Sequence, residues 1–251
     1  MAAYPAEAIV LHRISLGETD RIVTLLTLER GKLHAVAKGS RRPGGKFGGA
    51  SELFTRSRLL LAEGRNLDII TQCEVVESFM GLRGDLALLA RATYLCELVD
   101  CLLEEREPDD DVFHLLETAL HLLTHCGDGP DVVVHAFELR LLGVRGYAPE
   151  LGRCVRCGEA LPRRRGGFSP SLGGALCPAC RPAAADAVGL GPEGLHWLRE
   201  LAEGDPIALV GRAPGVEAAR DVQRCLRRFV RYHVERDLKS ADFLDMVRQT
   251  A

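Results

Sequence analysis

Four cysteines constrain this chain more than any other feature, because their spacing matches that of a tetrahedral metal site. Cys154 and Cys157 form one C-x2-C pair, Cys177 and Cys180 form a second, and nineteen residues separate the pairs. Two such pairs at this separation are typical of four-cysteine zinc sites, in which each pair places two thiolates on one side of Zn²⁺. Since four protein ligands leave no position for water or substrate, the predicted zinc ion is structural rather than catalytic.

The residues around the cysteines agree with zinc, whereas the alternatives are two disulfide bonds or a chance spacing. Gly158 follows the first pair, where a tight turn past the sulfurs favours glycine. Residues 168–176, with Gly173 and Gly174 in the middle, can supply a hairpin between the pairs. The segment is too short to build its own core. Metal binding, on the order of 10–16 kcal/mol in isolated zinc modules, is therefore expected to hold its fold together.

The composition is that of an ordinary soluble protein. The chain has 251 residues, 47% hydrophobic and 27% charged, which is enough for one large domain or two to three small ones. It contains no run of eighteen apolar residues and no signal-peptide pattern, so we expect a cytoplasmic protein with no membrane span. Nine cysteines without an export signal fit a reducing compartment. The five cysteines outside the array are expected to be small buried hydrophobes: Cys73, Cys96, Cys101, Cys126 and Cys225.

The net charge of −3 conceals an uneven distribution along the chain. Residues 1–80 carry a net charge of +2, residues 81–150 carry −9 and residues 151–251 carry +4. A local basic patch, rather than the average charge, is what meets phosphate. The slightly acidic total therefore does not exclude a nucleic-acid partner.

Short strand patterns fill the first eighty residues. Each run is apolar or β-branched, and glycine or a turn sequence separates it from the next. The expected strands cover residues 8–16, 21–28, 32–37, 58–62 and 67–72. Several short strands with turn signals within about seventy residues predict a small barrel.

Helical spacing begins at Leu82, after which apolar residues recur every three to four positions until Pro108. Further helices are expected over residues 112–125, 132–142, 192–201 and 215–238. We therefore predict an α+β protein with a barrel domain over residues 1–80 and an α-helical domain over 81–251. The helical domain carries a zinc-binding insertion at 150–182.

The loop from Lys38 to Lys46 is the first candidate nucleic-acid site. It holds four basic residues and four glycines or prolines between two predicted strands. Such a loop can follow the phosphates of a single strand, although a solvated flexible loop explains the same composition. Aromatic residues for base stacking are few, since Phe47 and Phe54 are equally suited to a core. The candidate DNA-binding residues of this region are Lys38, Arg41, Arg42, Lys46, Arg56 and Arg58.

A basic stripe on the last long helix is the second candidate. Its arginines recur at helical spacing and share one broad face, with apolar residues on the other. An ordinary solvated face is the alternative, although such faces usually mix acids with bases and this one does not. The stripe consists of Arg220, Arg224, Arg227, Arg228 and Arg231.

Motifs for catalysis are missing from the sequence. The basic loop departs from the ATP-binding pattern G-x4-G-K-[ST], because Ser40 occupies the first glycine position and Phe47 replaces the Ser/Thr. There is no G-x-S-x-G sequence. His121 and His125 are four residues apart, but no third metal ligand accompanies them. We therefore predict a protein that is not an enzyme and does not use ATP.

Several segments, in this order, resemble the bacterial RecO family of recombination mediators and DNA repair proteins, and the likeness extends over nearly the whole chain. The segments are residues 17–27 (GETDRIVTLLT), 94–100 (YLCELVD), 137–149 (FELRLLGVRGYAP) and the cysteine segment 154–180 with Phe168-Ser-Pro. The resemblance implies an N-terminal OB-fold, a helical domain and a zinc ribbon-like insertion. The basic loop is unusually rich in arginine and glycine, so its register against the family is open.

The resemblance also implies a function. Members of such a family bind single- and double-stranded DNA without ATP, anneal complementary strands and engage single-strand-binding protein. With the partner RecR they help a recombinase displace that protein from single strands. The basic barrel loop with Arg56 and Arg58 is the DNA site that the resemblance suggests, and no residue-level site for a partner follows from it.

Three other functions fit parts of the sequence. A zinc-containing OB-fold transcription or translation factor shares the nucleic-acid chemistry, and a strand-annealing assay without ATP would separate it from a mediator. A hydrolase with a structural zinc would need an acid–base constellation that the sequence lacks. A protein-only scaffold would not be retained on a phosphate-rich resin at low salt.

Overall fold

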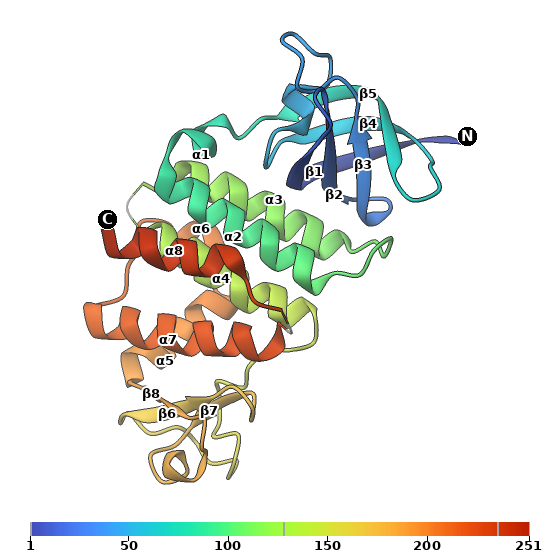
Figure 1. The fold of residues 1–251 in the computed structure, drawn as a ribbon. Coiled ribbons are helices and arrows are strands. Elements are labelled where there is room, and N and C mark those ends of the chain that lie inside the picture. The colour runs from blue at the N-terminus through green and yellow to red at the C-terminus, as the bar shows by residue number, and fades with distance from the viewer. Residues whose placement is uncertain (1, 128, 235, 251) are drawn as a thin grey trace. The chain divides into compact units, whose positions relative to one another are not determined.

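The computed structural model describes residues 2–127, 129–234 and 236–250. The chain divides into two compact units, of which the first combines Met1–Thr124 with Leu238–Ala251 and the second covers His125–Asp237. The first unit holds a β-barrel and helices, and the second holds helices and a small sheet (Figure 1). The predicted α+β class, with a barrel, a helical part and a four-cysteine segment, is confirmed. The division predicted at residue 80, with an insertion at 150–182, stays a prediction.

The barrel of the first unit is closed and OB-like. The strand order β1-β2-β3-β5-β4 returns to β1, and every neighbouring pair is antiparallel except β3 with β5. All five predicted strands are present, with boundaries shifted by a few residues. They are β1 (Ala3–Leu16), β2 (Asp20–Thr27), β3 (Gly31–Ala37), β4 (Arg56–Ala62) and β5 (Asp68–Glu77).

Alternating residues of each strand fill the barrel. Along β1, Tyr4, Ala6, Ala8 and Val10 belong to one buried cluster, as the period-two geometry of a strand requires. Small alanines on β1 and β3 let the sheet close around larger leucines from β2, β3 and β4. At the β2–β3 turn, Gly31 has φ +65°, and a Cβ there would lie 2.1 Å from the Glu107 carbonyl oxygen. No other residue fits this close approach.

Four helices complete the first unit: α1 (Met80–Gly84), α2 (Leu86–Leu102), α3 (Asp110–His125) and α8 (Lys239–Thr250). The Asp85 carboxylate caps α2 by accepting from the amides of Ala87 (2.7 Å) and Leu88 (3.0 Å). Asp109 caps α3 in the same way, through the amide of Val112 at 3.0 Å. Both caps place the start of a helix directly after the polar residues of a turn.

The helix predicted over 215–238 is wrong at its C-terminal end. It ends at His233, and Val234 has extended backbone angles. The chain then starts a separate helix, α8, which packs against α2 of the first unit. The Glu97 carboxylate on α2 accepts from the amides of Lys239 (3.2 Å) and Ser240 (2.8 Å) at the start of α8. This cap comes from a residue distant in sequence, so local periodicity did not indicate it.

The second unit combines the cysteine segment with four helices: α4 (Pro130–Val144), α5 (Pro192–Glu203), α6 (Pro206–Leu209) and α7 (Val216–His233). Its sheet has the order β7-β6-β8, with β6 (Gly166–Ser169), β7 (Gly174–Leu176) and β8 (Val188–Leu190). Phe168 of β6 meets Phe229 of α7 edge to face at 5.3 Å between ring centroids. This contact packs the sheet onto the apolar face of α7.

Within the ranges that the structure describes, no helix is both long enough and apolar enough to span a bilayer.

Candidate metal centre and nucleic-acid interface

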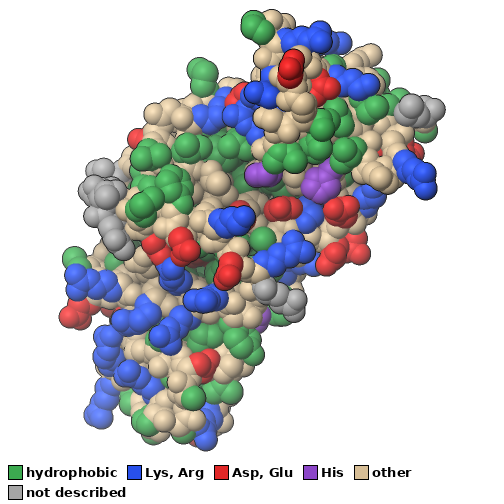
Figure 2. Space-filling model, viewed as in Figure 1, with side chains coloured by type: hydrophobic (Ala, Val, Ile, Leu, Met, Phe, Trp, Pro, Cys, Tyr) green, Lys and Arg blue, Asp and Glu red, His purple; other side chains and the backbone are tan. Residues whose placement is uncertain are grey.

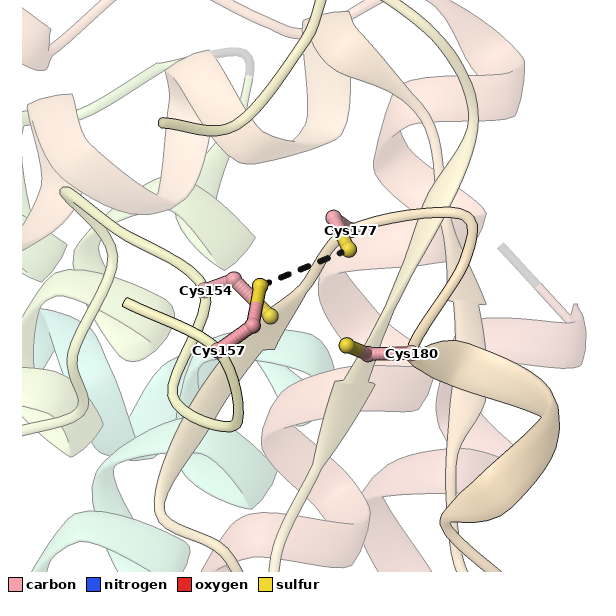
Figure 3. A group of neighbouring side chains, drawn as sticks. All are labelled: Cys154, Cys157, Cys177 and Cys180. Atoms are coloured by element: carbon pink, nitrogen blue, oxygen red, sulfur yellow. Dashed lines mark hydrogen bonds between the residues drawn. The ribbon is translucent and has the colours of Figure 1, made fainter. Parts of the chain in front are cut away.

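The four cysteines predicted as metal ligands meet in space (Figure 3). Their sulfur atoms all lie within 4.8 Å of one another, and the Cys157 and Cys177 sulfurs are 3.9 Å apart. Tetrahedral zinc with Zn–S bonds of about 2.3 Å needs sulfurs about 3.8 Å apart. A disulfide needs about 2.05 Å, and all nine cysteines are free thiols. The geometry therefore fits a metal ion better than the two disulfides that the spacing left open.

Two tight turns aim the sulfurs at a common point. In the first, the Gly158 amide donates to the Cys154 carbonyl at 2.8 Å, and Gly158 has φ +75°. In the second, the amides of Cys180 (3.2 Å) and Arg181 (3.0 Å) donate to the Cys177 carbonyl. The turn conformation predicted for Gly158 is confirmed. Strands β6 and β7 hold the two turns side by side, as the hairpin expected between the pairs.

The thiols show the electrostatics of a cation site. Burial raises the pKa of Cys154, but the backbone amides of Cys177, Cys157 and Arg156 outweigh it and lower the pKa to about 6. The pKa of Cys180 rises to about 12, first through its hydrogen bond with Cys177 and then through burial. Backbone amides thus stabilise the first thiolate, and its negative charge opposes the ionisation of a second thiol. A bound cation removes that opposition, because it stabilises every thiolate that coordinates it.

The predicted basic loop joins β3 to β4, and its four basic side chains are exposed. Its backbone is anchored, since the Arg41 amide donates to the Thr19 carbonyl at 2.9 Å and the Gly39 amide donates to Asp20 at 2.8 Å. The Gly39 amide is also the main cause that lowers the pKa of Asp20. The Lys46 ammonium lies 5.5 Å from the centre of the Phe47 ring. The loop therefore presents four cations together on a fixed base: Lys38, Arg41, Arg42 and Lys46.

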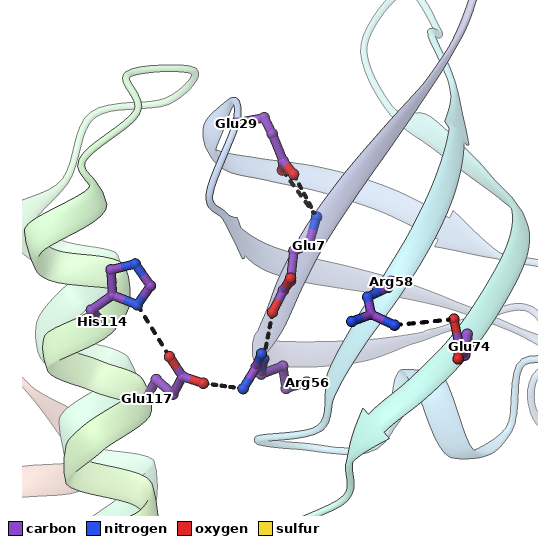
Figure 4. A network of polar contacts seen from close by, with 7 residues as sticks. All are labelled: Glu7, Glu29, Arg56, Arg58, Glu74, His114 and Glu117. Carbon is purple, nitrogen blue, oxygen red and sulfur yellow. Dashed lines mark hydrogen bonds and ion pairs between the residues drawn. The ribbon is translucent and has the colours of Figure 1, made fainter.

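Arg56 and Arg58, the two strand arginines, have different surroundings (Figure 4). The Arg56 guanidinium is 22% exposed, donates to Glu7 at 2.5 Å and also pairs with Glu117 of α3. Arg58 is 62% exposed and lies 3.6 Å from the equally open Glu74. Arg56 is thus occupied by two carboxylates inside the first unit, whereas Arg58 is held weakly and faces solvent.

The arginine stripe lies on the exposed face of α7, and all five of its members are exposed. Figure 2 shows Lys and Arg side chains gathered over this helix. Arg224 is engaged within the unit, because it donates to the Asp221 carboxylate and, at 2.8 Å, to the Gly189 carbonyl. Asp221 is only 4% exposed and was missed in the sequence, although its i,i+3 spacing from Arg224 was a usable signal.

The histidines singled out in the sequence do not form a metal site. Among the described residues, only the four cysteines form a group of side chains placed to share an ion. The His121 ring instead packs edge-on against Phe79, 4.8 Å between centroids. This contact gives His121 a packing role in the first unit.

Comparison with known proteins gives one consistent result. A family model described as "Recombination protein O N terminal" matches residues 1–79, and "Recombination protein O C terminal" matches residues 83–242. Among curated proteins, the DNA repair protein RecO of Symbiobacterium thermophilum is 43% identical over 251 residues, covering 99% of both chains. The protein of the same name from Pelotomaculum thermopropionicum is 41% identical, covering 99% of this chain and 96% of its own. That from a Nocardioides species is 42% identical, covering 96% and 99%.

Proposed function

Because this chain belongs to the RecO family of DNA repair proteins, we propose that it is a recombination mediator that binds single- and double-stranded DNA. It anneals complementary strands without ATP. Together with RecR it helps load the recombinase onto strands coated by single-strand-binding protein. It acts by binding rather than by catalysis, and it works in the cytoplasm, where bacterial DNA is repaired.

The observation that carries this proposal is the basic loop of the barrel. Lys38, Arg41, Arg42 and Lys46 extend from one anchored loop into solvent, and the nearby acid is Asp20. Cations grouped in this way displace the counterions of a polynucleotide, and that release favours binding. OB barrels commonly hold single strands along the adjacent strand face, where Arg58 is also exposed.

Annealing follows from a second basic surface, the arginine stripe on α7. Two complementary strands repel each other as polyanions until cations reduce that repulsion. One basic surface lies in each compact unit, so one molecule offers two places at which a strand is attracted. In this proposal Arg227, Arg228 and Arg231 contact phosphate, and Arg224 mainly supports the helix through Asp221.

The metal at the four cysteines is zinc in this proposal. Four thiolates in a tetrahedral arrangement select Zn²⁺ or an iron–sulfur cluster over harder ions, and the two C-x2-C turns are typical of zinc. Bound zinc supplies no chemistry to annealing. Cys154, Cys157, Cys177 and Cys180 would hold it, and it would fix the turns that carry β6 and β7.

The proposal is tested by annealing labelled complementary oligonucleotides without ATP, with and without the double change Arg41→Ala and Arg42→Ala. We expect the double variant to bind single strands about tenfold more weakly at moderate salt. The slope of log affinity against log salt should fall by about 1.4, since each lost phosphate contact removes about 0.7. The melting temperature should not change, because both side chains are exposed.

Arg65→Ala is the matched control, since Arg65 is an exposed arginine on the β4–β5 turn of the same barrel. It should change affinity less than twofold. Binding of DNA without annealing by the wild type would favour the transcription or translation factor instead. A wild type that ignores oligonucleotides at low salt would contradict the proposal as a whole.

A further inference from the structure

A hollow of about 470 Å³ lies in the second unit beside the four cysteines. Two arginines, Arg165 and Arg181, line it together with Pro178, Pro182 and three alanines. Pro178 lies inside the second C-x2-C pair, and Arg181 follows it directly. The hollow therefore combines two cations with small apolar walls, next to the metal-binding turn.

A pair of glycines shapes the position of Arg181. Gly167 of β6 and Gly189 of β8 face each other across the two strands. A Cβ on Gly167 would lie 2.8 Å from Cγ of Arg181, and one on Gly189 would lie 3.2 Å from its Nη2. The arginine thus lies flat across a surface without side chains, and any larger residue at either position would displace it.

Arg165 converges on the same place. Its Nη2 atom is 3.3 Å from the point where a Cβ on Gly189 would be, so the terminal nitrogens of both arginines lie beside Gly189. The buried Asp221 carboxylate orients Arg165 at 2.8 Å and also binds Arg224. The cluster therefore contains three guanidinium groups and one carboxylate, an excess of two positive charges.

Arg181 places one of these uncompensated positive charges at the hollow. It is half-buried, and no carboxylate or carbonyl among the described residues accepts a hydrogen bond from its guanidinium. Arg165, by contrast, is already paired. Two guanidinium groups held side by side repel each other unless an anion lies between them. Their forked N–H donors match the oxygens of a phosphate.

We propose that this hollow binds a backbone phosphate of a nucleic-acid strand, at a site separate from the barrel loop. The inference rests on the proposed function, in that it assumes a chain that binds DNA. A phosphate would bridge Arg165 and Arg181, and the adjoining sugar would pack against Pro178 and Pro182. A polynucleotide fits better than a free anion, because Arg224 and the exposed arginines of α7 extend the positive surface beyond one phosphate.

The test compares Arg181→Gln with the wild type as full-length, metal-loaded protein, by fluorescence anisotropy of labelled single strands over a range of salt. We expect about three- to tenfold weaker binding and a salt slope lower by about 0.7, the loss of one phosphate contact. Arg163→Gln is the control, since it removes an exposed arginine of the same segment that does not line the hollow. It should change affinity less than twofold.

A second variant guards against misfolding. Arg181→Lys keeps the stem that lies over Gly167 and the charge but lacks the fork, so its affinity should fall between that of the wild type and that of Arg181→Gln. Metal content and melting temperature should match the wild type in both variants. In millimolar inorganic phosphate, Arg181→Gln should still bind single strands more weakly than the wild type.

Three results would overturn the inference while leaving the proposed function intact. They are an unchanged affinity for Arg181→Gln, an equal loss for Arg163→Gln, and a difference that inorganic phosphate abolishes, since the last would indicate a site for a free anion. A wild type that binds no DNA would instead remove the proposed function on which the inference rests.

Discussion

The barrel and the four-cysteine segment of this chain are held together by different means. Twelve buried side chains, contributed by all five strands, form the core of the barrel. Around the cysteines, the local buried cluster has three members, Cys154, Leu176 and Cys177, and two of them belong to the cysteine array. Phe168 of the same segment is also buried, but it packs against Phe229 of α7. Burying a large apolar side chain stabilises a fold by about 1.5–3 kcal/mol. The barrel can therefore fold on apolar burial, whereas we expect the two cysteine turns to depend on a bound metal.

This difference shows two ways to hold a basic surface in place. In the barrel, the Thr19 carbonyl and the Asp20 carboxylate accept hydrogen bonds from backbone amides of a loop whose cations remain exposed. In the four-cysteine segment, Arg181 lies over the glycine pair directly after the second cysteine turn. Loss of the metal should therefore disturb the second surface and leave the first.

Metal removal should give the largest difference between the barrel and the four-cysteine segment. A chelator, or Cys177→Ser, should unfold the two turns at residues 154–158 and 177–181 and loosen the strands that join them, because metal binding contributes on the order of 10–16 kcal/mol to such modules. Hydrogen exchange is the measurement. The amides of β6, β7 and β8 should lose protection, while those of β1–β5 keep it.

The affinity for single strands should fall under chelation to the level of Arg181→Gln and no further, because the basic loop of the barrel does not depend on the metal. Cys73→Ser is the control, since this thiol packs against the barrel core and belongs to the other compact unit. Equal loss of protection in the barrel strands would contradict the division between the two regions.

A buried polar contact in the barrel gives the next largest effect. The Asp68 side chain is inaccessible to solvent and accepts from the Tyr4 hydroxyl at 2.5 Å, the Gly64 amide at 3.0 Å and Arg106 at 3.2 Å. Asp68→Asn should lower the free energy of unfolding by about 2–4 kcal/mol, because it removes the charge from a set of charged hydrogen bonds. Urea denaturation measures the loss, and the bound metal should be unaffected.

The same carboxylate predicts a pH dependence. Burial raises the pKa of Asp68, but the hydrogen bonds from Tyr4, Gly64 and Arg106 outweigh it, so the pKa in the folded state lies below its ordinary value. Its stabilisation is therefore complete above about pH 4 and is lost as pH falls through the folded-state value. Wild type should lose stability in acid more steeply than Asp68→Asn. Glu74→Gln, which changes a carboxylate that is 71% exposed, should cost less than about 0.5 kcal/mol.

Local patterns in the sequence were sufficient for most of the fold. Short apolar and β-branched runs punctuated by glycine indicated the barrel, and periodic leucines indicated α2 and α3. The start of α8 was not visible, because its cap is the Glu97 carboxylate, more than a hundred residues away. Contacts between distant residues are what local periodicity does not encode.

The candidate sites also differ in whether local sequence or distant contacts determine them. Metal ligands follow from spacing alone, since two C-x2-C turns bring four sulfurs together. The role of an arginine depends on its partners, and the sequence did not indicate that Glu117 would pair with Arg56 or that Asp221 would hold Arg224. The glycine pair under Arg181 depends on the register of β6 with β8 and was equally hidden.

The smallest expected effects come from replacing one glycine by alanine in a turn of each region. Gly158 in the first metal-binding turn and Gly17 in the β1–β2 turn both have positive φ, +75° and +59°, and a Cβ on either would meet no atom within 4 Å. Alanine at each position therefore costs only backbone strain, about 1–2 kcal/mol. Gly158→Ala should weaken metal binding by a factor of about 5–30, because folding and metal binding are one process there. Gly17→Ala should leave metal affinity unchanged and lower only the stability of the barrel.

Competition with a chromophoric chelator measures the metal affinity of each variant, and urea denaturation measures the stability of the barrel. Weakened metal binding in Gly17→Ala would mean that the barrel and the metal centre are not independent.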